Sequence, residues 1–331
     1  MNSARVDLLV ADIQFQHNCS YSSALQILYC GWNCGFFSNC SVTLSYLINL
    51  YLQNIAPCKI DFSRGFSYFK TPTQIEKQED TFKDYFTINS EVNINLGSKV
   101  LVPNHHGIYN RIDFSQYNPF IQKYFSLSPA IVELKGWLID KYQVCLSKTL
   151  VVFYRGTDKD KEVHVAPYEM FIQEAEKILQ KYPDFRVLIQ TDQSQVRLAF
   201  KRHFADKCFY FEELPVTSGK LVMHKCDLQQ LEMDKFEFGR RLLAVTHLIS
   251  TCHTIITHTG NMGLWVCLFR GNSHRVIQQF QEFGMLSPSM YSLITSYYVK
   301  RLLRRLKRPL NFPQSMATRE DDVLPQSVNT Q

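Results

Sequence analysis

The chain has 331 residues, of which 45% are hydrophobic, 13% aromatic and 20% charged, and these proportions are typical of a globular protein. A chain of this length can form two domains of ordinary size. The formal net charge is +6, and the six basic residues between Tyr298 and Pro309 equal all of it, which excludes a general nucleic-acid-binding surface.

The sequence predicts a cytoplasmic protein. No run approaches the roughly 18 apolar residues of a membrane-spanning helix, and the N-terminal residues lack the apolar centre of a secretory signal. The ten cysteines form no CxxC pair and show no zinc-site spacing. We therefore expect reduced thiols and no bound metal.

The first half of the chain shows one strand–turn–helix pattern. Residues 1–24 are weakly patterned, and we expect a lead-in there. Ala24 to Trp32 predicts a strand, and the helix-like run SVTLSYLINLYLQ follows the turn NCGFFSN. This order is typical of the opening of a nucleotide-binding unit, although a purely structural turn is the alternative. The candidate ligand loop consists of Gly35, Phe36, Ser38 and Asn39.

The chain then alternates between further strands and helices. Lys59 to Tyr68 predicts a strand with a loop, and a helix is expected from the Ser128-Pro129 pair to Tyr142, with the serine as its cap. In the second half, strands are expected at residues 150–154, 184–190, 208–211 and 254–257. Helices are expected at residues 167–181, 194–204, 236–250 and 263–271.

Alternation of strands and helices predicts an α/β fold with a parallel sheet and helices on both faces. Because the pattern occurs twice, we expect two facing Rossmann-like domains with a cleft between them. The N-terminal domain spans 25–147, on the probable acceptor side, and the C-terminal domain spans 148–290. A basic helix at 291–309 and a disordered tail at 310–331 complete the expected organisation.

Three strand ends in the second half carry residues that bind anions. Arg155 with Thr157-Asp158-Lys159 follows the first strand, Thr191-Asp192 the second, and His258-Thr259-Gly260-Asn261 the last. The carboxyl ends of parallel strands meet at one edge of a sheet, where ligands bind. The last strand runs into a helix whose N-terminal amides attract anions, and an arginine offers a planar fork of donors. Together these features predict a nucleotide-diphosphate site.

The same motifs resemble those of a known enzyme family. YRGTDK (154–159), then Pro167-x-Glu169, then strands ending in Thr-Asp and Thr-Gly, resemble the fucosyltransferase superfamily, which includes α1,6-fucosyltransferases, nodulation fucosyltransferases and protein O-fucosyltransferases. The turn NCGFFSN looks like that family's glycine loop. The resemblance covers roughly residues 25–275. It implies a GT-B fold and inverting transfer from a nucleotide sugar such as GDP-fucose, without a metal or other cofactor.

The resemblance also implies roles for individual residues. Arg155 matches the arginine on the donor β-phosphate, where its charge stabilises the leaving diphosphate. Asp158, Lys159 and Asp192 match family positions near the donor, and Thr259 with Gly260 matches residues that contact phosphate. This chain differs from the α1,6 enzymes in having Phe153 in place of a histidine and Gly156 in place of a second arginine. His253 stands where a base-recognising aspartate is expected.

Two assignments are left with alternatives. Glu162 is the candidate base for the acceptor hydroxyl, and a solvated loop glutamate is the alternative. Asp158-Lys159-Asp160 matches a metal-binding DxD pattern, but its lysines oppose a dication, so we expect no metal. We predict a glycosyltransferase that moves a sugar from its donor to a glycan or other hydroxyl acceptor. The alternatives are a different nucleotide sugar, a non-catalytic nucleotide-binding protein, or a nucleic-acid-binding module.

The basic segment Lys300–Arg308 interleaves six cations with three leucines. Such a segment can lie on an anionic membrane surface, which would place the protein at the membrane periphery. A solvated helix that packs its leucines on the protein body is the alternative.

Overall fold

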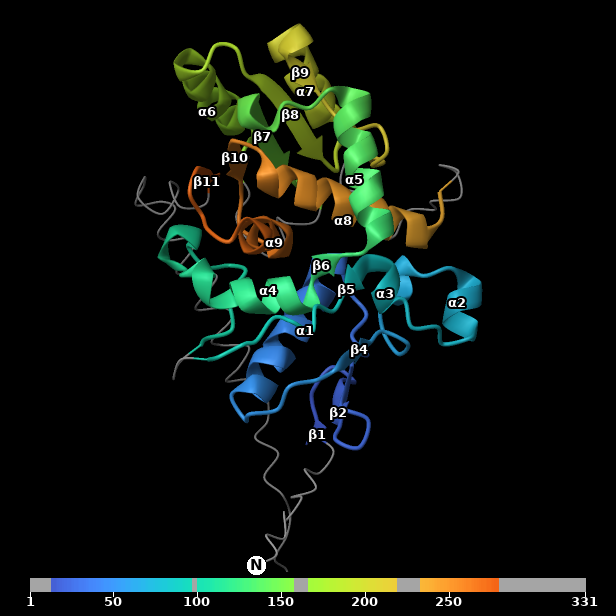
Figure 1. Cartoon of the computed structure of the whole chain (residues 1–331). Coiled ribbons are helices and arrows are strands. Elements are labelled where there is room, and N and C mark those ends of the chain that lie inside the picture. The colour runs from blue at the N-terminus through green and yellow to red at the C-terminus, as the bar shows by residue number, and fades with distance from the viewer. Residues whose placement is uncertain (1–12, 97–99, 158–165, 219–232, 280–331) are drawn as a thin grey trace, which may run out of the picture. The chain divides into compact units, whose positions relative to one another are not determined.

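The computed structural model describes residues 13–96, 100–157, 166–218 and 233–279 (Figure 1). The chain divides into two compact units, Met1–Phe283 and Gly284–Gln331, and every described residue belongs to the first. No helix within the described ranges is long and apolar enough to cross a membrane.

A five-stranded parallel sheet forms the centre of the second half of the chain. It consists of β7 (Thr149–Tyr154), β8 (Arg186–Thr191), β9 (Cys208–Phe209), β10 (Thr254–Thr257) and β11 (Val276–Gln278). The strand order is β11-β10-β7-β8-β9, and every neighbouring pair is parallel. All six residues of β7 are buried, as expected for a central strand covered on both faces. The predicted parallel sheet is confirmed.

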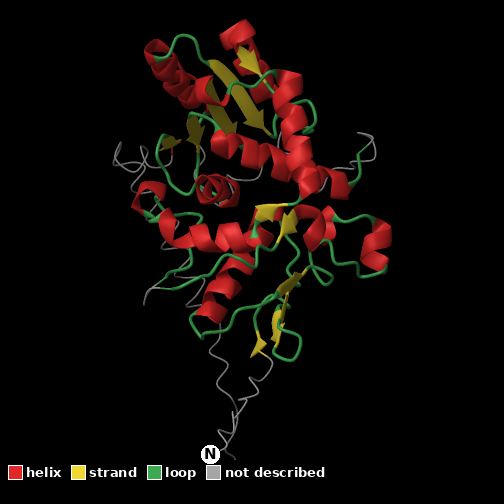
Figure 2. Cartoon of the chain, in the orientation of Figure 1, coloured by secondary structure: helices red, strands yellow, loops and turns green. Residues whose placement is uncertain are grey.

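Helices cover both faces of this sheet (Figures 1 and 2). Leu150 and Val152 lie in a core with residues of α6 (Tyr168–Lys181) and α7 (Ser194–Phe204). Val151, which points the opposite way, belongs to a larger core with α8 (Lys235–Thr251) and α9 (Asn261–Arg270). Successive strand residues face opposite sides of a sheet, so the run of apolar residues in β7 supplies both cores.

The N-terminal part forms a smaller, mixed sheet of β1 (Ile13–Gln14), β2 (Ser20–Ser22), β3 (Ile27–Tyr29) and β4 (Lys59–Asp61). Only β3 and β4 are parallel, and α1 (Phe36–Tyr51) lies between them in the sequence. The strand–turn–helix pattern is present, but β1 and β2 lie in residues where no strand was expected. The two-domain GT-B arrangement and its boundaries stay a prediction.

Short elements connect these sheets. They are α2 (Pro72–Glu76), α3 (Phe82–Tyr85), β5 (Phe86–Thr87), α4 (Asn118–Tyr124), β6 (Ser126–Leu127), α5 (Pro129–Tyr142), and single 3₁₀ turns at Ser67–Phe69, Tyr109–Arg111, Phe114–Tyr117, Leu146–Lys148 and Ala205–Lys207. The α5 helix begins where predicted. Ser128 makes no capping bond, because its hydroxyl donates to the Asp84 carbonyl instead.

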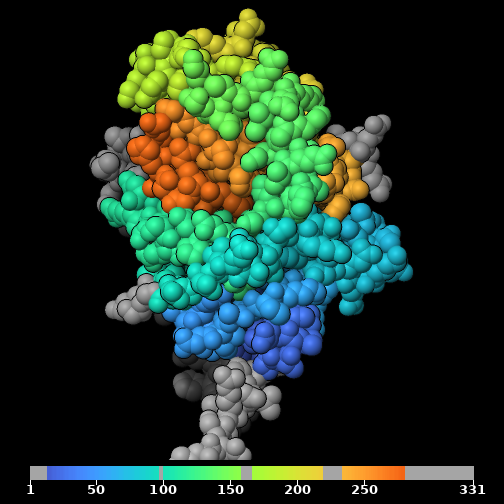
Figure 3. All heavy atoms as spheres, viewed as in Figure 1, coloured from blue at the N-terminus to red at the C-terminus, as the bar shows by residue number. Residues whose placement is uncertain are grey.

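The larger core is shared by the two halves of the chain. Phe37 of α1 packs against Trp265 of α9, with ring centroids 5.9 Å apart, and Phe69 stacks on Phe238 of α8 at 6.2 Å. Figure 3 shows atoms of α4 and α9 in contact, and these two helices are neighbours in the structure. The same core therefore contains residues from both sides of the predicted domain boundary between residues 147 and 148.

Candidate functional site

A cavity of about 440 Å³ lies at the carboxyl ends of β7 and β8, next to the start of α1. Its walls come from residues far apart in the sequence. They are Asn33, Cys34, Gly35, Phe36, Phe37, Ser38, Tyr68, Phe69, Phe153, Arg155, Gln190, Thr191, Asp192, Leu214, Pro215, Phe238, Leu242, Asn261 and Met262. Seven residues that the sequence placed in the ligand loop or at the strand ends line this one cavity: Gly35, Phe36, Ser38, Arg155, Thr191, Asp192 and Asn261.

The loop before α1 presents its backbone to the cavity. Gly35 is the N-cap of α1, no side chain caps the helix, and a β-carbon on Gly35 would meet nothing within 4 Å. Asn39 does not line the cavity. Its amide holds the loop in shape by accepting from Cys34 N at 3.3 Å and donating to the Cys34 carbonyl at 3.2 Å.

Arg155 and Asp192 meet at the edge of the sheet, as the strand order predicts. The Arg155 Nε atom lies 3.5 Å from Asp192 Oδ2, and the Arg155 side chain is 34% exposed, so a ligand can reach it. Asp192 also accepts from the Gly156 amide at 3.2 Å and from the Thr157 hydroxyl at 2.7 Å. Asp192 therefore holds both Arg155 and the backbone that follows β7.

Burial controls the ionisation of Asp192. It raises the pKa of this carboxyl above the ordinary value, against the Thr157 hydroxyl, the Arg155 charge and the Gly156 amide, which all lower it. The carboxylate at neutral pH thus carries a desolvation cost that its three partners offset only in part.

Gly156 leaves no room for a side chain. A β-carbon there would lie 2.3 Å from Gln193 Oε1 and 2.8 Å from the Tyr154 ring. The glycine lets the chain turn directly after β7, and this turn brings Arg155 to Asp192.

His258 belongs to the last of the three predicted strand ends, although the sequence assigned it no role, and it joins the ends of β7 and β10. The Arg155 amide donates to His258 Nε2 at 3.0 Å, so this nitrogen carries no proton. His258 Nδ1 lies 2.7 Å from the Thr259 carbonyl, which can only accept, so the proton is on Nδ1. The imidazole is buried and neutral, and it fixes the backbone position of Arg155.

Thr259 and Gly260 lie outside the cavity wall. The Thr259 hydroxyl and the Gly260 amide donate to the His105 carbonyl at 2.8 and 2.9 Å, and the Tyr109 hydroxyl donates to the Gly260 carbonyl at 2.9 Å. Asn261, the first residue of α9, does line the cavity, and its side chain accepts from the Ser41 hydroxyl at 2.8 Å. Thr259 and Gly260 are therefore hydrogen-bonded to the segment from His105 to Tyr109 and do not line the cavity.

Two helix starts and one guanidinium face the same space. Neither α1 nor α9 has a side-chain cap or an acidic residue in its first turn. The first amides of a helix lack partners within the helix, and the helix dipole places positive charge there. With Arg155, these helix starts make the cavity suited to a phosphate-type anion.

The rest of the wall is mostly apolar. Phe153, Phe238, Leu214, Pro215 and Met262 offer surfaces on which an aromatic base or a sugar face can pack. Sequence reasoning missed these wall residues except Phe153. Leu214 and Pro215 come five and six residues after the end of β9, so their proximity to a strand end was the only available signal.

Several predicted residues lie outside the described ranges. Asp158, Lys159 and Glu162 do so, and so does the basic segment Lys300–Arg308. His253 lies immediately before β10, at the amino end of that strand, whereas the cavity lies at the carboxyl ends of the strands. Among the described residues, no three His, Cys, Asp or Glu side chains gather as a metal site.

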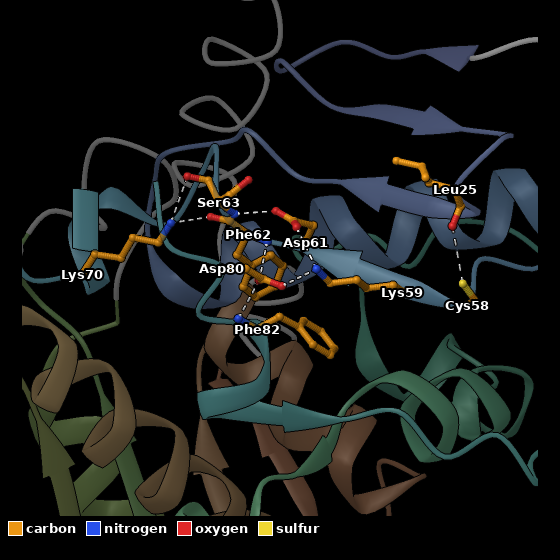
Figure 4. Close-up of polar contacts among 9 residues, drawn as sticks. All are labelled: Leu25, Cys58, Lys59, Asp61, Phe62, Ser63, Lys70, Asp80 and Phe82. Atoms are coloured by element: carbon orange, nitrogen blue, oxygen red, sulfur yellow. Dashed lines mark hydrogen bonds and ion pairs between the residues drawn. The ribbon is translucent and has the colours of Figure 1, made fainter. Parts of the chain in front are cut away.

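A second cavity, of about 330 Å³, adjoins Asn33 and contains Arg64 and Lys70. Figure 4 shows that the buried Lys70 ammonium donates to the carbonyls of Phe62 and Ser63. Burial lowers the pKa of Lys70. The two hydrogen bonds that Lys70 donates hold the turn after β4 and offset part of the cost of burying its ammonium group.

Comparison with solved structures finds matches, and the one described here is a weak likeness. No protein-family model matches the chain, and no curated protein matches it. A crystal structure of the NodZ α-1,6-fucosyltransferase co-crystallised with GDP matches 40% of this chain at 17% identity, with a TM-score of 0.27. The match spans 38% of that protein. A TM-score this low does not establish a common fold.

Proposed function

We propose that the protein is a glycosyltransferase that uses a nucleotide-sugar donor. The proposed donor is GDP-fucose, the acceptor is a hydroxyl of a glycan or another molecule, and the transfer proceeds with inversion and without a metal. The donor diphosphate occupies the cavity beside Arg155, and the base or sugar packs on its apolar wall.

One observation carries this proposal: Arg155 and the uncapped starts of α1 and α9 line one cavity. A nucleoside diphosphate needs positive charge beside an apolar surface, and this cavity supplies both. The motif resemblance to fucosyltransferases supports the same assignment and suggests the sugar.

The reaction assigns a task to each end of the site. The acceptor hydroxyl oxygen bonds to the anomeric carbon while the bond from that carbon to the diphosphate oxygen breaks. Arg155 and the helix starts stabilise the negative charge on the departing diphosphate. The hydroxyl proton passes to a base, for which Glu162 remains the proposed residue and Lys159 a proposed neighbour of the leaving group.

The test is a thermal-shift screen of the full chain against GDP-, UDP- and ADP-sugars, because a ligand that binds the native state raises the melting temperature. Arg155→Ala should weaken binding of the active donor about 10- to 100-fold, as expected for loss of a charge-assisted contact. The matched control is Arg202→Ala, which removes an exposed arginine of α7 and should leave binding unchanged. Absence of binding and hydrolysis for the whole panel would overturn the proposal.

A second candidate is a non-catalytic nucleotide-binding protein. Asp192 is the single carboxylate among the described lining residues, and it is already engaged by Arg155, Gly156 and Thr157. The described wall thus offers no spare base. Nucleotide binding without donor hydrolysis or transfer, with Glu162→Gln indistinguishable from wild type, would favour this candidate.

A further inference from the structure

Cys19 immediately precedes β2 and Cys30 immediately follows β3, and these two strands are antiparallel neighbours. The register pairs Ser20 with Tyr29 and Tyr21 with Leu28, so its extension by one residue places Cys19 opposite Cys30. Side chains directly opposite on an antiparallel pair point to the same face. Both thiols are buried, with exposed fractions of 1% and 3%.

The backbone hydrogen bonds define the type of pair. The Cys30 amide donates to Asp61 of β4 at 2.9 Å, and the Cys19 amide donates to the Gln16 carbonyl at 3.3 Å. The two cysteines therefore exchange no backbone hydrogen bonds with each other. In such a non-hydrogen-bonded pair the Cα atoms are about 4.5 Å apart. This separation lies within the range of roughly 4.4–6.8 Å that disulfides span.

The surroundings of the two sulfur atoms also place them together. The Cys30 Sγ accepts from the Thr43 hydroxyl of α1 at 3.3 Å. Both thiols lie near Tyr46, one turn further along α1, where their negative charge contributes to raising the pKa of the phenol after the larger effect of burial. The Cys30 thiol is the main group that lowers the pKa of Cys19. Burial raises the pKa of Cys30 well above its ordinary value, so Cys19 is the first of the two thiols to ionise and attack.

We propose that Cys19 and Cys30 are a disulfide-forming pair that links β2 to β3. With a small-molecule disulfide such as oxidised glutathione, the Cys19 thiolate attacks one sulfur, forms a mixed disulfide and releases one glutathione thiolate. The Cys30 thiolate then attacks Cys19 Sγ, closes the protein disulfide and releases the second thiolate. The two cysteines lose two electrons and two protons, and the oxidant becomes two thiols.

A disulfide between Cys19 and Cys30 would restrain the start of the loop that lines the cavity. Cys30 immediately precedes Gly31, and a β-carbon on Gly31 would lie 2.3 Å from the Asn18 carbonyl oxygen. The backbone at Gly31 therefore already lies tightly against Asn18, in the segment before β2. A covalent link at Cys19 and Cys30 fixes the base of this loop without altering the residues that face the cavity.

Other cysteines with nearby thiols are less suited to pairing. Cys34 Sγ donates to Asn39 Oδ1 at 3.1 Å and belongs to the cavity wall. Cys58 and Cys145 are exposed, so they are sites for intermolecular bonds. A Cys58→Ser, Cys145→Ser background removes this complication and leaves the buried pair intact.

The experiment maps disulfides in that background after equilibration with oxidised glutathione and alkylation of remaining thiols. Trypsin cannot separate Cys19 from Cys30, because no Lys or Arg lies between Arg5 and Lys59. Chymotrypsin cleaves after Phe15, Tyr21, Tyr29 and Trp32, so the expected product is residues 16–21 linked to residues 30–32. Recovery of Cys19 and Cys30 in alkylated form, or linkage of either to Cys34 or Cys40, would overturn the proposal.

Stability provides a second readout. The oxidised protein should melt roughly 5–10 °C above the reduced protein, because the bond closes a short loop in the unfolded chain. Cys30→Ala in the same background should abolish this difference, whereas Cys208→Ala, which removes a buried cysteine of β9, should retain it. An oxidation-dependent shift that survives Cys30→Ala would contradict the assignment. If Cys30→Ala does not fold, the peptide map of the parent decides.

Discussion

Gly260 has a backbone conformation that almost no other residue adopts. Its φ of 143° and ψ of 170° fall in a region essentially restricted to glycine. The residue is the N-cap of α9, and its amide and carbonyl are both bonded to the segment from His105 to Tyr109. Gly260 therefore fixes where α9 begins and how Asn261 reaches the cavity.

We expect Gly260→Ala to lower the free energy of unfolding by about 2 kcal/mol, because alanine is strained at this φ. The control is Gly136→Ala within α5, where a β-carbon meets nothing within 4 Å. That change should raise the free energy of unfolding by roughly 0.5–1 kcal/mol through helix propensity. Urea denaturation of both variants measures the difference, and equal effects would refute the role given to the Gly260 conformation.

The carboxyl of Asp192 has different effects on protein stability and on ligand binding. Its pKa is raised in the folded protein, so the native state binds this proton more readily than the unfolded chain does. The contribution of Asp192 to stability consequently falls as the pH rises above its ordinary pKa, and it reaches its lowest value above the raised pKa. At neutral pH the carboxylate is retained at a cost.

We expect Asp192→Asn to leave the melting temperature at pH 7 nearly unchanged, because relief of the burial cost offsets the lost ion pair. Donor affinity should fall at least about tenfold, since Arg155 loses the partner that positions it. Calorimetric titration with GDP and a thermal melt would measure the two effects. Unchanged GDP affinity would show that Asp192 does not position Arg155 for a ligand.

At the scale of elements, α8 carries a titratable side chain, His247, that is mostly buried. His247 packs against Phe269 with ring centroids 5.1 Å apart, and its Nδ1 has no hydrogen-bond partner among the described residues. Burial, with a smaller effect of the Lys135 charge on α5, lowers the pKa of His247 to about 4. The folded protein therefore holds this imidazole neutral.

The direction of the pH effect follows from this shift. The unfolded chain binds the proton near pH 6.5 and the native state only near pH 4. The contribution of His247 to the free energy of unfolding is therefore fully present above pH 6.5 and is lost as the pH falls toward 4. The loss is on the order of 3 kcal/mol. His247→Leu should flatten the pH dependence of unfolding between these values, and His274→Leu, at an exposed site, should not. Equal slopes for all three proteins would contradict this account.

The long elements were predictable because each has a strong local pattern. The apolar run of β7 and the periodic apolar face of α8 identify a strand and a helix without reference to the rest of the chain. β1 and β2 have two and three residues, too few for any periodicity, and they exist only through pairing: β2 pairs with β3, and β1 pairs with β2. A pair such as Cys19 and Cys30 depends on that register, so scanning cysteine spacings did not find it.

At the scale of the whole molecule, strand ends were predictable and long-range contacts were not. Arg155 and Asp192 meet because neighbouring parallel strands end at one edge. The sequence contains no sign that Thr259 and Gly260 bond to the His105 carbonyl, since that contact depends on the path of a separate loop. The apolar wall likewise depends on how α8 and the segment near Leu214 pack.

The basic segment supports a prediction for the full chain. We expect the protein to bind vesicles that contain phosphatidylserine and not vesicles of neutral lipid, because Lys300–Arg308 carries six cations. Replacing Arg301, Arg304 and Arg305 by glutamate should reduce vesicle binding more than about tenfold, since each cation contributes on the order of 1 kcal/mol. Co-sedimentation measures this, with GDP affinity as the control for folding. Undiminished sedimentation would refute membrane contact through this segment.

The contact between α1 and α9 has a consequence for biosynthesis. Phe36 and Phe37 of α1 are buried in the mature protein, and the Phe37 ring packs on Trp265 and Phe269, more than two hundred residues further along the chain. A ribosome adding roughly 5–20 residues per second needs about 10–40 seconds to reach them. During this interval α1 has left the ribosome, but the residues of α9 that pack on Phe37 have not yet been made. Newly made chains are then most exposed to aggregation, and heterologous production should improve when chaperones are supplied, whereas slower translation lengthens the interval and should lower the yield of soluble protein.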